Sequence, residues 1–300
     1  MADAPPPLIF DRALVATRLD RAWARADRNA GADFLLARAA EELADRLALV
    51  KRDFAFALDV GTPGPHAAAA LAARSGGGAT ARLAPTFLSA GSGPFARAVG
   101  DLERLPLAAH SVDLVVSLYA LHQVNDLPGA LIQMRRALKP DGLLIAALAG
   151  GDTLSELRQS LTIAESDVTG GASPRIAPFA DVRALGGLLQ RAGFALPVVD
   201  LDTTVVRYAD IGALMRDLRA FGAANALHLR SRRPLRRAVL KRAAEVYAER
   251  FADPDGRLPA RFETIWLSGW APHESQPKPL KPGSAAMRLA DALKSDDRNA

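Results

Sequence analysis

Residues 112–151 limit what this chain can fold into more than any other stretch, because they have the pattern of a strand, a helix, a tight turn and a second strand. Val112 to Ser117 is a short apolar run rich in β-branched residues, which is typical of a buried strand. A helix follows, with Asn125 or Asp126 as its capping residue, and a Lys-Pro-Asp-Gly turn ends it. Leu143 to Leu148 is almost continuously apolar, as expected of a parallel strand that is covered on both faces.

Strand–helix–strand units of this length cross over right-handed and build open sheets with helices on both sides. We therefore predict an α/β fold with a doubly wound, mostly parallel sheet and flanking helices. Ligands of such sheets bind beyond the carboxyl ends of the strands. In this chain those ends carry residues 117–125 and 149–153, so we expect the functional site there.

The chain has 300 residues, of which 49% are apolar, and it contains no cysteine. This composition suits one large domain with a real core, and it excludes disulfides, thiolate nucleophiles and cysteine-ligated zinc. We expect no metal site. The chain lacks an uncharged apolar run of about 18 residues, and its first residues lack the pattern of a signal peptide. The sequence therefore predicts a cytoplasmic protein.

The order of these patterns predicts the domain organisation. We expect residues 1–9 to be disordered and residues 10–50 to form N-terminal helices. The α/β domain should cover 51–275, with a helical insertion at about 208–252, and 276–300 should form a tail.

Local patterns add two further predictions. Thr86 to Ser89 is the expected second strand, in a stretch that is otherwise rich in Gly, Ala and Ser. Thr153 and Glu156 have the spacing of a capping box, in which each side chain bonds the backbone of the other residue, at the start of the next helix.

The basic residues cluster late in the chain. The net charge is +5, and residues 228–242 contain seven Lys or Arg and no acidic residue. Such a cluster is either a solvated helix face or a contact for anionic lipid or an acidic protein. Because no nucleic-acid motif or aromatic platform accompanies it, we expect no nucleic-acid partner. Peripheral contact of this segment with a membrane stays open.

A short loop after the first predicted strand has the pattern of a cofactor site. Asp59, Gly61 and Gly64 lie where α/β sheets hold adenosine-containing cofactors. Glycines let the backbone approach the ligand closely, and the following helix offers free N–H groups. Asp101 precedes the strand at 112–117, where an acidic side chain can accept a hydrogen bond from an exocyclic amine.

With these motifs the chain resembles the class I S-adenosylmethionine-dependent methyltransferases. More specifically, it is similar to the complex I assembly factor 5 family and its proteobacterial relatives, over about residues 10–290. The matching motifs are LDVG (58–61), DLERLP (101–106), VDLVVSLYALHQVNDLPGAL (112–131), LKPDG (138–142), GGDTLSELR (150–158), GGASPRIAPF (170–179), LLQRAGF (188–194), GWAPHESQ (269–276) and KPGSA (281–285). The motifs from residue 150 onward are not general to methyltransferases, which makes the resemblance specific.

The resemblance implies a seven-stranded methyltransferase-type sheet and S-adenosylmethionine as the cofactor. The family is associated with hydroxylation of an arginine in a core subunit of respiratory complex I during assembly. The implied partner is therefore a protein substrate, a complex I subunit, met at the inner face of the membrane.

The resemblance also assigns residues. The cofactor-binding residues that it implies are Asp59, Gly61, Gly64, Asp101, Leu102, Ser117 and His122. His122 and Asn125 are the candidate catalytic residues. Arg175 and His273 lie in family-specific motifs, where they either contact the partner protein or tie the late part of the chain to the core.

The sequence departs from the family pattern at the cofactor loop. Pro63 and Pro65 stand where the second and third glycines of the family loop belong, and proline fixes φ and donates no hydrogen bond. Residues 86–93 contain no acid to bind the ribose hydroxyls. Loss of that partner costs roughly 1.5–3 kcal/mol, or about ten- to a hundredfold in affinity. S-adenosylmethionine binding is therefore in doubt on these residues.

Three functions stay open. The first is an S-adenosylmethionine-dependent enzyme that hydroxylates or methylates a protein substrate in complex I assembly. The second is a catalytically inactive relative that serves as an assembly or binding module, and the altered loop favours it. The third is a small-molecule or acyl-carrier carboxyl methyltransferase, against which the family-specific C-terminal motifs argue.

Overall fold

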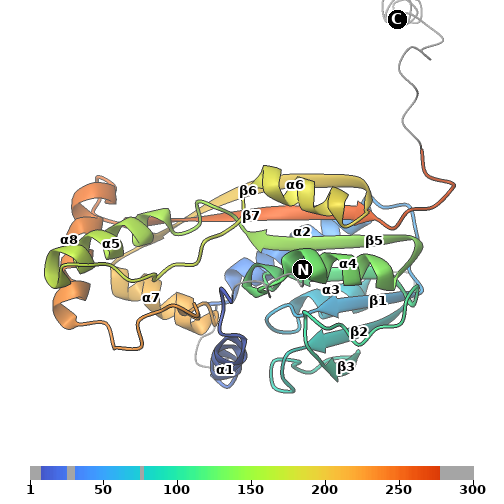
Figure 1. Cartoon of the computed structure of the whole chain (residues 1–300), viewed down its shortest axis with the longest axis horizontal. Helices are drawn as coiled ribbons and strands as arrows, with labels where there is room; N and C mark the ends of the chain where they lie inside the picture. Colours follow the sequence, from blue (N-terminus) through green and yellow to red (C-terminus); the bar gives the residue numbers. More distant parts are fainter. Residues whose placement is uncertain (1–7, 26–30, 75–77, 278–300) are drawn as a thin grey trace, which may run out of the picture.

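A computed structural model describes residues 8–25, 31–74 and 78–277. One seven-stranded sheet runs through it in the order β3-β2-β1-β4-β5-β7-β6 (Figure 1). The strands are β1 (Phe56–Val60), β2 (Ala79–Ala84), β3 (Ala96–Val99), β4 (Val112–Leu118), β5 (Leu138–Ala149), β6 (Ala195–Tyr208) and β7 (Leu258–Trp270). Pairing is parallel from β3 through β5, and β7 is antiparallel to both of its neighbours. The predicted doubly wound, mostly parallel α/β sheet is confirmed.

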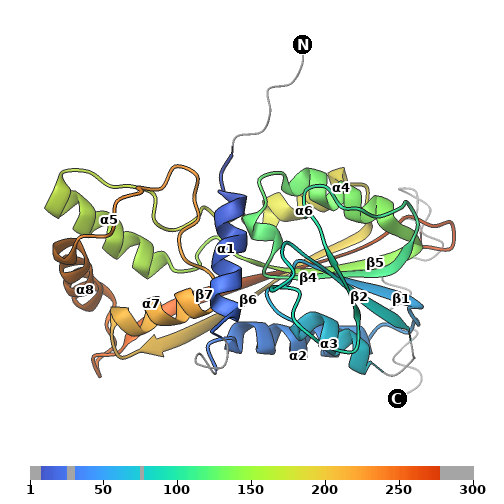
Figure 2. The same cartoon turned by 90° about the horizontal axis from the view of Figure 1, so that it is seen from below.

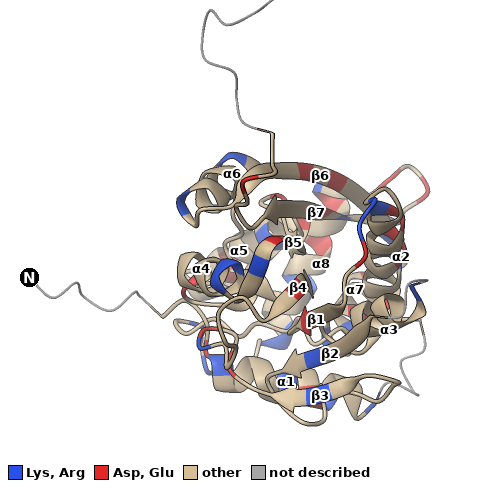
Figure 3. Ribbon diagram, turned by 90° about the vertical axis from the view of Figure 1, so that its right-hand side faces the viewer, with Lys and Arg blue, Asp and Glu red and all other residues tan. Residues whose placement is uncertain are grey.

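Eight α-helices surround this sheet in the described residues. They are α1 (Arg12–Trp23), α2 (Phe34–Ala48), α3 (His66–Ala73), α4 (Leu127–Ala137), α5 (Ser155–Thr169), α6 (Val182–Arg191), α7 (Ile211–Ala220) and α8 (Arg237–Phe251). Figure 3 shows α2 and α3 on one face of the sheet and α4 and α6 on the other. Alternate residues of the central strands lie on opposite faces of the sheet: Leu114 and Val116 pack with α2, whereas Val115 packs with α4.

The long strands β6 and β7 continue past the other strands and carry a helical group, α5, α7 and α8, at their far end (Figure 1). Helix α5 packs along α8 within this group. Figure 2 shows α1 standing between the helical group and the rest of the sheet. Within the described ranges, no helix combines the length and the apolar composition needed to cross a bilayer.

The helical insertion expected at 208–252 coincides with α7 and α8, although the helical group also includes α5, which precedes it. The domain limits themselves stay predictions. Most of the predicted disordered segment 1–9 and tail 276–300 lies outside the described residues.

The predicted second strand at Thr86 to Ser89 was wrong. The strand lies at Ala79–Ala84, and Thr86 and Ser89 instead close a turn in which the Ser89 backbone N–H donates to the Thr86 hydroxyl at 3.0 Å. The pattern of β2 escapes notice because a charged residue, Arg82, interrupts its apolar run.

The predicted capping box was also wrong. Leu154, rather than Thr153, precedes α5, with φ of 56° and no side-chain cap. The Thr153 hydroxyl instead accepts from the backbone N–H of Glu263 at 3.0 Å and donates to its carbonyl at 3.1 Å. Glu156 accepts from the backbone N–H of Arg261. Tertiary bonds to β7 thus replace the local capping bonds.

Candidate functional site

The predicted cofactor loop joins β1 to α3 at the carboxyl edge of the sheet. Gly61 and Gly64 have φ of 75° and 79°, a conformation that favours glycine. Pro65 caps the N-terminus of α3, where its missing N–H has no cost, so the loop accommodates this proline. Pro63 faces a small cavity described below. Neither Pro63 nor Pro65 is therefore the main obstacle to cofactor binding in the crevice.

A buried ion pair lies beneath the loop. Asp59 and Arg82 are both 0% exposed, and an Arg82 Nη1–Asp59 Oδ2 distance of 2.7 Å joins them. The Arg82 guanidinium also donates to the carbonyls of Thr62, Gly64 and Ser89. Burial raises the pKa of the Asp59 carboxyl, and the Arg82 charge and the Thr62 hydroxyl oppose that shift. Asp59 therefore has a structural role: through Arg82 it holds the loop against β2.

Helix α1 covers the other side of the same loop. A Cβ placed on Gly64 would lie 1.7 Å from Cζ2 of Trp23, so the indole of Trp23 rests directly on this glycine. Leu19, one turn earlier on α1, is 6% exposed. The Thr86 hydroxyl donates to the carboxylate of Asp20, which ties the turn after β2 to the same helix.

The residues expected to bind adenine are also engaged with α1. Arg12 lies 2.7 Å from the Asp101 carboxylate and 3.0 Å from that of Glu103. Leu102 is buried, and a Cβ placed on Gly61 would lie 2.6 Å from Leu102 Cδ1. Leu102 therefore packs on the glycine where a bound adenosyl group would need space.

Beside the loop lies a cavity of about 30 Å³, which α1, Gly61, Pro63 and Leu102 help to line. Ligand sites for small molecules and cofactors have volumes of about 300–1,000 Å³. The cavity beside the loop is thus roughly tenfold smaller than such a site, and the polar residues predicted to hold the cofactor already have partners within the chain. The residues present here do not fit the cofactor that the family resemblance implies.

Two other predicted residues have structural partners. The buried Ser117 hydroxyl donates to the Val60 carbonyl at 2.7 Å. The Asn125 side chain accepts from the backbone N–H groups of Ile9 and Phe10 at 2.8 and 2.7 Å, which anchors the segment that leads into α1. Asp126, the alternative cap, accepts from the backbone of α4 and begins that helix.

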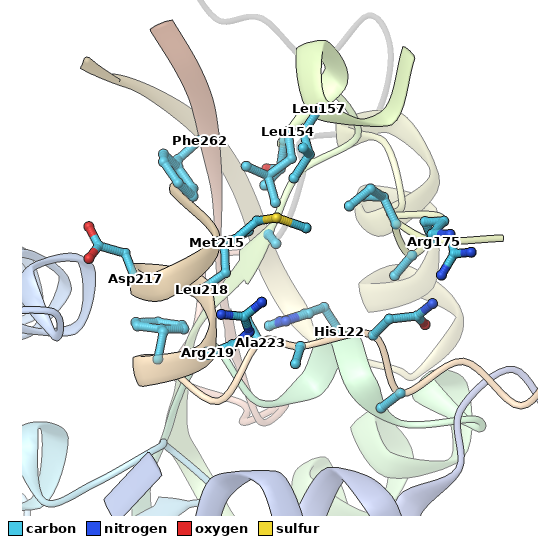
Figure 4. Close-up of a pocket in the computed structure, with 18 of the residues that line it drawn as sticks. His122, Leu154, Leu157, Arg175, Met215, Asp217, Leu218, Arg219, Ala223 and Phe262 are labelled. Atoms are coloured by element: carbon cyan, nitrogen blue, oxygen red, sulfur yellow. The ribbon is translucent and has the colours of Figure 1, made fainter. Parts of the chain in front are cut away.

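A second, larger cavity lies between the strand ends and the helical group (Figure 4). Its volume is about 400 Å³ and its lining is mostly apolar. Figure 4 shows Met215, Leu218 and His122 around the same space, with Arg175 near its edge. We call this space the apolar cavity.

His122 is the predicted residue that faces the apolar cavity. Its ring lies edge-on to Tyr119 and Phe179, with centroids 6.4 and 5.7 Å apart. Its Nδ1 is buried and meets no hydrogen-bond partner among the described residues. Burial lowers the pKa of His122 to about 4, so the imidazole is neutral near pH 7. A neutral imidazole can accept a hydrogen bond from a bound group or donate one to it.

The two residues from the family-specific motifs lie apart. Arg175 forms a two-pronged ion pair with Glu165 of α5, at 2.6 and 3.2 Å, and so ties the loop after α5 to that helix. His273 lies on the surface beyond β7, where its Nδ1 meets the Ser275 hydroxyl at 2.7 Å. Arg175 lines the apolar cavity, whereas His273 does not.

The residues that fill the crevice were not found from the sequence. Trp23 and Arg12 come from a helix far from the loop in the chain, and no local pattern reveals such a contact. Arg82 left one signal, a lone charge in an otherwise apolar and small-residue stretch after the first strand. A buried charge there needs a partner, and Asp59 on the neighbouring strand β1 supplies it.

A methyltransferase-domain model matches residues 58–146. The chain is 39% identical over 294 residues to "Arginine-hydroxylase NDUFAF5, mitochondrial" of Danio rerio, covering 95% of this chain and 90% of that protein. It is 37% identical over 278 residues to malonyl-[acyl-carrier protein] O-methyltransferase of Laribacter hongkongensis, covering 87% and 90%. The solved structure of the YcgJ protein of Bacillus subtilis matches with a TM-score of 0.54 at 15% identity, over 79% of this chain and 99% of that one, and supports the fold alone.

Proposed function

We propose that this member of the class I S-adenosylmethionine-dependent methyltransferase family, which is 39% identical to the arginine hydroxylase NDUFAF5, is an assembly protein for respiratory complex I. In this proposal the chain works without S-adenosylmethionine. In this proposal the methyltransferase scaffold binds a polypeptide partner, a complex I subunit. Binding takes place in the bacterial cytoplasm, at the inner face of the membrane.

The filled crevice carries the proposal. Opening a space of cofactor size would require α1 to leave the loop, which exposes Leu19 and Trp23 and breaks the pairs between Arg12 and the acids after β3. It would also strain the bonds from Asn125 to the backbone at Ile9 and Phe10. The burial of Leu19 and Trp23 and the polar contacts of Arg12 and Asn125 all favour the arrangement in which α1 lies against the loop.

The rival function is an active enzyme in which α1 moves aside as a lid. The near full-length similarity to proteins named as an arginine hydroxylase and as carboxyl methyltransferases supports a transferase or hydroxylase. The apolar cavity beside the strand ends, with His122 facing it, would then receive the substrate. The two proposals differ in one requirement, which is the cofactor.

Complex I assembly in a strain that lacks the gene tests the proposal. The amount of assembled complex is measured on native gels and by NADH:quinone activity. Deletion should lower both, and the native chain should restore both. Asp101→Ala removes the expected adenine anchor and a partly exposed ion pair, so it should restore assembly as well as the matched surface control Asp45→Ala does.

Two results would overturn this account. Normal complex I in the deletion strain would remove the assembly role. Failure of Asp101→Ala, at native protein levels and with Asp45→Ala functional, would show that the adenine anchor is needed and would favour the enzyme.

A further inference from the structure

A strongly basic groove adjoins the apolar cavity. Its volume is about 540 Å³, and five arginines line it: Arg18, Arg175, Arg230, Arg232 and Arg233. We call it the arginine groove. Arg18, Arg175 and Asn225 line both spaces, so the groove and the apolar cavity meet at these residues.

The positive charge of the groove is only partly compensated. Arg175 pairs with Glu165, and Arg230 lies 3.1 Å from Asp11, which among the described residues is the one carboxylate that lines the groove. Arg18, Arg232 and Arg233 make no ion pair with any described residue. The first half of the basic segment 228–242 therefore lines a concavity, whereas the alternative of a merely solvated helix face would leave it on a convex surface.

Arg18 provides an independent sign that a partner is missing. Its Nη1 is buried and has no acceptor among the residues that the structure describes. Burial lowers the pKa of Arg18, the neighbouring charges of Arg230 and Arg21 act in the same direction, and the Asp11 carboxylate opposes the shift. A buried guanidinium N–H without an acceptor is costly, and an anion at the junction of the two spaces would remove that cost.

We propose that the arginine groove and the apolar cavity together bind an anionic amphiphile, with its carboxylate or phosphate head among Arg18, Arg232 and Arg233 and its alkyl chain in the cavity beside Met215. The apolar volume of about 400 Å³ lies within the range of small-molecule sites. The proposed head residues Arg18, Arg232 and Arg233 do not line the crevice beside Gly61, and the proposal does not require the assembly function.

Calorimetric titration of the purified full chain tests this site, with n-alkyl carboxylates of six to twelve carbons kept below their micellar concentrations. Each methylene that enters the cavity should tighten Kd about fourfold until the cavity is full. Alkanols of the same length lack the charge and should bind about ten- to a hundredfold more weakly. Alkyl phosphates form a parallel series; binding of either head supports the site, and the tighter head identifies a free fatty acid or a phospholipid-type source.

Variants separate the head site from the tail site. Arg232→Gln with Arg233→Gln changes only exposed side chains, so it should fold and should weaken the carboxylates about tenfold or more. Met215→Trp narrows the cavity and should end the chain-length series at shorter chains. The charge-matched control, Lys241→Gln with Arg257→Gln, removes two charges outside both spaces and should bind like the native chain.

The proposal is overturned if neither the carboxylates nor the alkyl phosphates bind, if alkanols bind as tightly as the charged series, or if inorganic phosphate alone binds as well as the alkyl phosphates. Equal weakening by the groove variant and by the control variant would also overturn it, because the effect would then come from net charge. None of these results depends on complex I assembly.

Discussion

The buried pair of Arg82 and Asp59 gives the sharpest prediction about stability. Arg82→Leu leaves the Asp59 carboxylate buried without its counter-charge and leaves the carbonyls of Thr62, Gly64 and Ser89 without their donor. Removing one partner of a buried pair costs about 3–5 kcal/mol. Because folded domains are stable by about 5–15 kcal/mol, this one change should remove a large part of the free energy of unfolding.

Urea denaturation followed by circular dichroism measures that loss. Asp59→Asn removes the charge that Arg82 neutralises, so Arg82→Leu should cost about 1–3 kcal/mol less in that background than alone. Arg207→Leu is the control, because Arg207 pairs with Asp253 and Asp255 on the surface and exposed pairs contribute little. If Arg82→Leu lowers the midpoint no more than Arg207→Leu does, Arg82 is not held under the loop as described.

Three further predictions concern α1 and the apolar cavity. Gly64→Ala should lower the free energy of unfolding by about 1–2 kcal/mol of backbone strain, and by a further amount from the clash of the new methyl group with Trp23. In a double-mutant cycle of urea unfolding, the clash contribution should vanish in the Trp23→Ala background. Equal costs in both backgrounds would contradict the contact. The folded pKa of His122, about 4, lies below its unfolded value, so the folded state binds fewer protons than the unfolded state. The free energy of unfolding should therefore fall by up to about 3 kcal/mol as the pH drops from about 6.5 to 4. His122→Gln should flatten that pH dependence, and an unchanged slope would refute the burial of His122. Since the chain has no cysteine, Leu19→Cys should react with a thiol reagent far more slowly than the exposed Thr17→Cys, and equal rates would show that α1 does not stay docked.

Much of the scaffold was predictable because its signals are local. The apolar runs of β4 and β5, with a capped helix between them, fix a parallel crossover, and that crossover fixes which edge of the sheet carries the site. The Asp210 side chain accepts from the backbone N–H of Ala213 at the start of α7, and Gly170, with φ of 77°, ends α5. Each of these depends on residues within a few positions of one another.

The state of the crevice was not predictable in the same way. The two prolines of the loop drew attention, yet the space is taken by Trp23, Leu19 and Arg12 of α1, which meet the loop only in the folded chain. Nor does the capping-box spacing at Thr153 survive, because β7 supplies stronger tertiary partners. Local propensity gives way where a distant strand or helix offers a better bond.

Calorimetric titration of the native 300-residue chain with S-adenosylmethionine tests the central claim most directly. With α1 in the crevice and about 30 Å³ left beside Gly61, no saturable binding is predicted at millimolar cofactor. A Kd in the micromolar range would contradict it, because the adenosyl group would then occupy the space that Trp23 and Leu102 fill.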